Sequence, residues 1–180
     1  MPKYDRRRKY FMVLDCETAT LPCAINYTEE QRKNIAITKP LIYDLGWKIM
    51  DKNGNIYNRV NYLVSEVFSV PSVFDTAYYK EKRPIYIEKM RNGEIVLANW
   101  ETIMTDFISD LSVCEAIGAY NSMFDFKKAI PFTELYISKL YSADFHNWLN
   151  WQTKSCEWLA NGGKVEGQQA FEESVFRFRG

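Results

Sequence analysis

Two short acidic segments carry the residue types in this chain that are best suited to chemistry. In the first, Asp15 and Glu17 are separated by one residue and follow an apolar run that starts at Lys9. Side chains two residues apart on a β-strand project from the same face, so these carboxylates would lie together. Their repulsion favours a divalent cation, and ligands that are all oxygen favour Mg²⁺ or Mn²⁺. The competing interpretation is a solvated strand terminus that binds nothing.

The second acidic segment places Asp125 four residues after Asn121, behind another apolar run. Asn121 is a good N-cap, so Asp125 would lie one turn into the helix that follows. Ligands of α/β folds commonly bind at the carboxyl ends of strands, which would bring Asp125 to the carboxylates of the first segment. An acidic residue in the first turn also stabilises a helix without any ligand, and that simpler role stays open.

In this order the two segments resemble the first two motifs of the DEDD superfamily of proofreading-type and oligoribonuclease-like 3′–5′ exonucleases. Phe11 to Thr18 is similar to an apolar strand that runs into D-x-E-T, and Asn121 to Asp125 is similar to N-x-x-F-D. The resemblance covers about residues 9 to 130. It implies an α/β, ribonuclease H-like fold with a five-strand mixed sheet flanked by helices.

The resemblance also implies an activity, which is metal-dependent hydrolysis of phosphodiester bonds at the 3′ ends of single-stranded DNA or RNA. Asp15, Glu17 and Asp125 would be the catalytic residues and would hold two Mg²⁺ or Mn²⁺ ions. Ions so placed clamp the scissile phosphate, activate a water and stabilise the leaving 3′ oxygen. The substrate-binding positions that the resemblance implies are Thr18, Asn121 and Phe124.

The chain departs from the family where the third motif is expected. That motif supplies a fourth carboxylate, with a His five residues before it or a Tyr four residues before it. The only histidine, His146, has Trp151 five residues later, and Asp144 follows Tyr141 by three residues. The segment from Glu172 to Phe178 instead resembles the helix that precedes the third motif.

Residues 1 to 180 are therefore expected to form one exonuclease-like domain that is truncated at its C-terminus. The alternative function is that of a catalytically impaired or truncated exonuclease-fold protein that binds nucleic acid or acts as an interaction module. A third interpretation is a non-enzymatic protein whose acidic residues are coincidental, and it predicts no metal binding.

Composition narrows the partners and the compartment. The 23 basic and 23 acidic residues balance, so nucleic-acid binding requires a local basic face. The only dense basic run is Arg6 to Lys9, for which a solvated flank is the simpler interpretation. Four cysteines without a CxxC pair, together with a single histidine, argue against a zinc site and predict a reducing, cytoplasmic compartment. No apolar stretch is long enough to span a membrane, so no membrane partner is expected.

The elements that must position the two segments follow from periodicity and turn residues. Alternation over 41–49, the Asn53-Gly54 turn and a returning strand at 56–64 predict an antiparallel meander with the first strand. A 3.6-residue spacing predicts a helix from Trp100 to Leu111. A loop is expected up to Pro40, and irregular structure with one or two short helices is expected over 65–97. The remaining expectations are a strand at 113–120, helices at 121–131 and 132–141, and a tail whose tryptophans are core.

Overall fold

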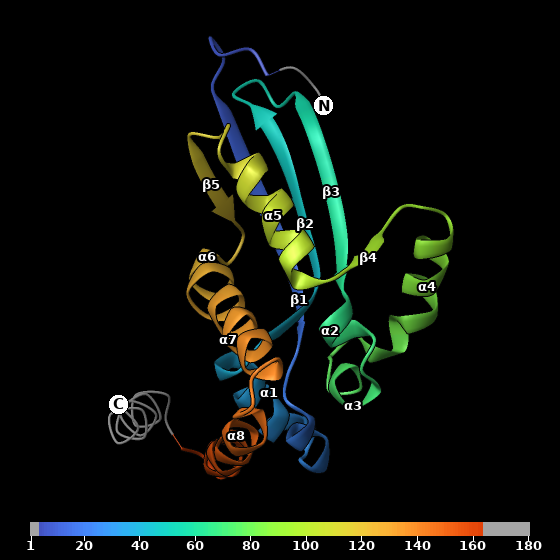
Figure 1. The fold of residues 1–180 in the computed structure, drawn as a ribbon, viewed down its shortest axis with the longest axis vertical. Helices are drawn as coiled ribbons and strands as arrows, with labels where there is room; N and C mark the ends of the chain where they lie inside the picture. The colour runs from blue at the N-terminus through green and yellow to red at the C-terminus, as the bar shows by residue number, and fades with distance from the viewer. Residues whose placement is uncertain (1–3, 164–180) are drawn as a thin grey trace.

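The computed structural model describes residues 4–163, and a five-stranded mixed sheet forms their centre (Figure 1). The sheet order is β4-β3-β2-β1-β5. Of the three long strands, β1 and β3 each run antiparallel to the central β2, whereas β5 runs parallel to β1 and β4 runs parallel to β3. The α/β class and the five-strand mixed sheet are therefore confirmed. The strands are β1 (Tyr10–Ala19), β2 (Leu41–Asp51), β3 (Ile56–Val64), β4 (Val96–Ala98) and β5 (Ala116–Ala119).

The β1–β2 pairing fixes the register of the sheet. It runs from Tyr10 opposite Asp51 to Ala19 opposite Leu41, with one irregularity between Glu17 and Thr18. The turn into β3 is stabilised by the Asp51 carboxylate, whose Oδ1 accepts the backbone N–H groups of Asn53 and Asn55 at 2.8 and 3.1 Å. The predicted meander and its hairpin are confirmed.

Helices cover the apolar face of the sheet, and Figure 1 shows α5 lying across the strands. Phe107 of α5 packs edge-on against Trp47 of β2, with ring centroids 5.5 Å apart. The indole N–H of Trp47 donates to Asp110 Oδ2 at 2.8 Å, so the buried ring has a polar partner. The main helices are α1 (Glu29–Thr38), α4 (Arg83–Arg91), α5 (Trp100–Leu111), α7 (Ile130–Leu140) and α8 (Phe145–Ala160). The shorter ones are η1 (Pro22–Asn26), α2 (Ser65–Phe68), α3 (Pro71–Phe74), η2 (Lys80–Lys82), α6 (Ser122–Phe124) and η3 (Asp125–Ala129).

The loop expected up to Pro40 is wrong, because this segment contains η1 and α1. Thr28 and Gln31 form a capping box at the start of α1, in which each side chain bonds the backbone N–H of the other residue. The box satisfies two N–H groups that the first turn of a helix leaves without intrahelical partners. The T-x-x-Q pattern that encodes it is readable in the sequence.

The region 65–97 contains more helix than expected, since α2, α3, η2 and α4 all lie within it. Of the tail tryptophans, Trp148 is buried in the core, whereas Trp158 is 41% exposed. The buried ammonium of Lys39 hydrogen-bonds Gln152 and lies 5.6 Å from the ring centroid of Phe132, which joins the end of α1 to α7 and α8. Within residues 4–163 no helix is long and apolar enough to cross a membrane. The predicted role of Glu172 to Phe178 lies outside the described residues.

Replacing Thr28 with Ala removes one half of the capping box and should lower the free energy of unfolding by about 1 kcal/mol. Urea denaturation followed by tryptophan fluorescence measures this change. Thr153→Ala is the matched control, because Thr153 lies exposed inside α8 and caps no helix. Equal stability of the Thr28→Ala variant and the unmodified chain would contradict a stabilising role for the box.

Candidate functional site

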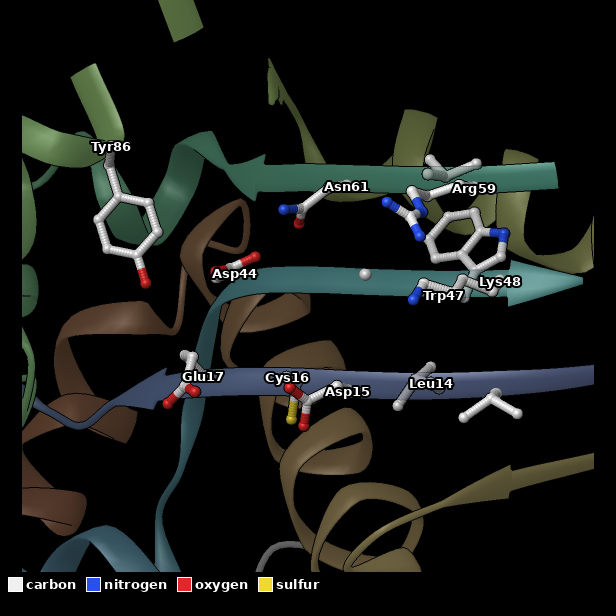
Figure 2. A pocket seen from close by; sticks show the side chains of 13 residues that line it. Leu14, Asp15, Cys16, Glu17, Asp44, Trp47, Lys48, Arg59, Asn61 and Tyr86 are labelled. Carbon is white, nitrogen blue, oxygen red and sulfur yellow. The ribbon is translucent and has the colours of Figure 1, made fainter. Parts of the chain in front are cut away.

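The side chains of β1 alternate between an apolar and a polar face. Met12 and Leu14 are each 1% exposed on the covered face, whereas Asp15 is exposed on the other. Glu17, two residues on, projects from the same side as Asp15 (Figure 2). The register places Glu17 opposite Asp44 and Asp15 opposite Gly46, so three carboxylates gather near the carboxyl end of β1.

These carboxylates line one end of a cavity of about 460 Å³ on the polar face of β1, β2 and β3. Lys48 of β2 and Arg59 of β3 line its other end, as a cross-strand pair. Neither of these cations forms an ion pair with another residue of the described chain. The cavity therefore has an acidic end and a basic end.

A glycine keeps the middle of this cavity open. A Cβ at Gly46 would lie 3.3 Å from Asn61 Oδ1 and 3.4 Å from the backbone oxygen of Val60, closer than most Cβ contacts. Asn61 Oδ1 is buried and has no hydrogen-bond partner within residues 4–163. An orphaned buried acceptor is costly, so its position beside the carboxylates suits a cation or a hydrogen-bond donor.

Burial and like charge oppose ionisation of the acidic end. The pKa of Glu17 is raised, first by burial and then by the charges of Asp15 and Asp44, while Lys82 acts in the opposite direction. Burial also raises the pKa of Asp44 to about 6, and Asp15 adds to the rise. A bound cation would relieve this repulsion, because it favours the charged form of every carboxylate near it.

Tyr86 of α4 supplies a polar partner for Asp44. Its hydroxyl points into the space between Asp44 and Glu17 in Figure 2, and hydrogen bonding by Tyr86 holds the pKa of Asp44 lower than burial alone would set it. The Tyr86 ring packs edge-on against Tyr43 with centroids 5.6 Å apart, so the hydroxyl has a fixed position. The site thus draws on α4 as well as the sheet.

Asp125 approaches from the other side of β1. Asn121 Oδ1 accepts the Phe124 N–H at 3.4 Å, so the predicted N-cap is confirmed. Asp125 is 4% exposed, and its Oδ1 accepts the thiol of Cys16 at 3.0 Å. Burial raises the pKa of Asp125, and the hydrogen bond from Cys16 partly offsets the rise.

Asp125 also begins the π-helical turn η3, in which its carbonyl accepts the N–H of Ile130. Pro131 has no N–H, so an uninterrupted α-helix would leave the carbonyl of Lys127 without a donor. Single π-helical turns inside helices are frequent at functional sites.

The predicted residues are therefore placed in different surroundings. Asp15 and Glu17 line the cavity together, whereas Asp125 contacts Cys16 and is absent from the cavity lining. Thr18 lines a separate cavity, and Phe124 packs partly buried against the core. No three acidic, histidine or cysteine side chains of residues 4–163 are grouped closely enough to hold a metal ion. The three-carboxylate metal set stays a prediction.

Comparison with known proteins leaves the family open. No protein-family model, no curated protein and no solved structure matches this chain. The site is therefore interpreted from its own residues.

Sequence reasoning missed several residues of this site. A readable signal existed for Asp44 and Lys48, because they occupy positions of β2 that alternate with its apolar residues. Tyr86 and Cys16 gave no such signal, since their roles depend on contacts between distant segments. The missed residues are Cys16, Asp44, Lys48, Arg59, Asn61 and Tyr86.

Replacing Asp44 with Asn should remove a destabilising charge and keep an acceptor for Tyr86. The folded Asp44 carboxyl has a pKa of about 6 against an ordinary value of 3.8, so the folded state holds a proton that the unfolded state has lost between these values. The protonated Asp44 carboxyl therefore stabilises the folded state relative to the ionised one. This contribution is fully present below about pH 4 and disappears as the pH rises through about 6. Asp44→Asn should therefore raise the free energy of unfolding at pH 7.5 by about 1 to 3 kcal/mol, with little change at pH 4.

The measurement is urea denaturation of chelator-treated protein at pH 4 and pH 7.5. Asp75→Asn serves as the control, because Asp75 is exposed and lies outside the cavity. A stability change that is the same at both pH values would refute an electrostatic origin.

Proposed function

We propose that this chain is a metal-dependent 3′–5′ exonuclease that acts on the 3′ ends of single-stranded DNA or RNA. The observation that carries the proposal is the cavity with Asp15, Glu17 and Asp44 at one end and Lys48 and Arg59 at the other. Carboxylates suit the divalent cations that phosphoryl transfer uses, and basic side chains suit the phosphates of the strand.

The sheet supports a ribonuclease H-like arrangement within this proposal. Its antiparallel β1–β2–β3 meander has β5 added in parallel beside β1. Parallel strands end at the same edge of a sheet, so Asp125, after β5, belongs to the edge at which Asp15 and Glu17 lie. The order of the motifs along the chain agrees with this placement.

The donor chemistry fits Mg²⁺ or Mn²⁺. Asp15 and Glu17 would hold the ions together with Asp125, and the unpaired oxygen of Asn61 supplies a further neutral acceptor in the same cavity. At such a site two bound ions supply Lewis-acid stabilisation of the phosphate, a more acidic water and charge neutralisation at the leaving oxygen. Carboxylates with raised pKa values are also the groups that gain most from a bound cation.

The residues of the chain itself have distinct roles. Lys48 and Arg59 would attract the phosphates of the strand to the basic end of the cavity. Tyr86 orients Asp44 through its hydroxyl, and Cys16 orients Asp125 through its thiol. Thr18 borders the 3′-terminal nucleotide in this proposal, while Asn121 holds the start of the helical segment that carries Asp125.

Asp15→Asn and Asp125→Asn should each reduce Mn²⁺- or Mg²⁺-dependent release of nucleotides from a 3′-labelled single strand by roughly 100-fold or more. Loss of even an outer partner of a metal ligand commonly costs 10- to 100-fold, so loss of a ligand itself should cost at least as much. Asp75→Asn, at an exposed position outside the cavity, should retain the full rate. Retained activity in Asp15→Asn would refute the assignment.

A second candidate is a nucleic-acid-binding module without hydrolysis. The observation that favours it is the position of Asp125, which bonds Cys16 and does not line the cavity. In that case the basic end of the cavity would still bind a strand, while the acidic end would lack a complete set of ligands.

Lys48→Gln combined with Arg59→Gln should weaken binding of a fluorescent single strand in EDTA under either candidate function. Removing two cations that neutralise phosphates reduces the salt dependence of single-strand affinity, so the slope of log affinity against log salt should fall in magnitude by about 1.4. Fluorescence anisotropy at several salt concentrations measures this slope. Arg91→Gln, at the exposed end of α4, is the control. An unchanged slope in the double variant would show that the phosphates of the strand do not bind at this end of the cavity.

A further inference from the structure

A second cavity, of about 610 Å³, opens beside the end of β1, apart from the carboxylates of the proposed hydrolysis. It lies between α1 and the segment 76–82, and Thr18 lines it from the sheet. Its volume is in the range of small-molecule sites. Asp15, Glu17, Asp44 and Asp125 do not line it, so its chemistry is separate from that of the carboxylates.

Most of the charged residues that line this second cavity are basic. Lys33 forms an exposed ion pair with Glu29, with an N–O distance of 3.7 Å. Arg32 differs, because its Nε is buried and has no hydrogen-bond partner among residues 4–163. A guanidinium presents a planar fork of donors that matches phosphate oxygens, and a buried donor without a partner is costly. The charged lining residues are Arg32, Lys33, Lys80 and Lys82, with Glu29 and Glu81.

Two tyrosines stand beside these cations. Tyr78 is 71% exposed and packs edge-on against Tyr79, with ring centroids 4.9 Å apart. Lys82 Nζ lies 3.8 Å from the centroid of the Tyr79 ring, so Tyr79 already has a cationic partner. The remaining face of Tyr78 is open to a planar group, and exposed aromatic rings beside basic side chains are the features that bind nucleotide bases and phosphates.

The wall that carries the tyrosines is fixed to the end of β1. The buried Thr76 hydroxyl accepts the Thr20 N–H at 2.8 Å and contacts the Thr20 and Val73 carbonyls at 3.1 and 2.6 Å. Ala77, next along the chain, is also buried. This anchoring sets the position of the tyrosines before any ligand binds, which reduces the entropy lost on binding.

We propose that this second cavity binds a nucleoside monophosphate, either free or at the end of a strand. Arg32 and Lys80 bind the phosphate, and Tyr78 stacks on the base. The inference stands on the cationic and aromatic lining alone, so it does not require that the carboxylate site hydrolyse anything.

The experiment is calorimetric titration of the full chain with dAMP in EDTA at low salt. The unmodified chain should bind dAMP saturably, and Arg32→Gln should weaken the affinity by about tenfold or more, because the variant cannot form a charge-assisted bidentate pair with the phosphate. Tyr78→Ala should also weaken it, whereas Arg91→Gln should leave it unchanged. Deoxyadenosine and inorganic phosphate, each of which carries half of the recognised groups, should bind more weakly than dAMP.

Absence of saturable dAMP binding by the unmodified chain would overturn the proposal, as would unchanged affinity in a folded Arg32→Gln variant. If thermal unfolding shows that Arg32→Gln is not folded, the pair Lys80→Gln and Tyr78→Ala, both at exposed positions, provides the same test. Asp15→Asn should bind dAMP normally whether or not hydrolysis occurs, which separates this proposal from the proposed function. If a short (dT) strand displaces dAMP, the cavity binds the end of a strand. If the strand does not displace dAMP, the cavity binds the free nucleotide.

Discussion

The register of the β1–β2 pair is the constraint on which the rest of the structure depends. Because side chains alternate along a strand, this register places Met12 and Leu14 under the helices and Asp15 and Glu17 on the polar face. A slip by one residue would bury both carboxylates and expose the apolar side chains. Because that exchange is costly, the register keeps Asp15 and Glu17 side by side despite their mutual repulsion. Asp44 of β2 is the third carboxylate of the group.

The sequence was sufficient to predict the elements whose signals are local. The meander followed from alternation and the Asn53-Gly54 turn, and α5 followed from its 3.6-residue spacing. The segment before Pro40 was predicted as a loop because its turn-forming residues outweighed the capping box of Thr28 and Gln31. The ribonuclease H-like assignment, in contrast, rests on short motifs and stays a prediction.

The candidate site was predictable only where one element supplies the residues. Asp15 and Glu17 share β1, so their common face follows from strand geometry alone. The hydrogen bond between Cys16 and Asp125 joins residues 109 positions apart, and no local pattern encodes it. The same holds for Tyr86 beside Asp44, because the path of the chain from β3 to α4 had to be known first.

Lys82 connects the two cavities. It lines the second cavity, between α1 and the segment 76–82, and its charge acts on Glu17 in the first cavity, on the polar face of the sheet. An anion that neutralises Lys82 would weaken the repulsion between this ammonium and any cation held by the carboxylates. Thermodynamic linkage makes the effect reciprocal, so the factor by which the anion strengthens cation binding equals the factor by which the cation strengthens anion binding. One lysine on a short helical turn would thus couple the binding of an anion in one cavity to the binding of a cation in the other.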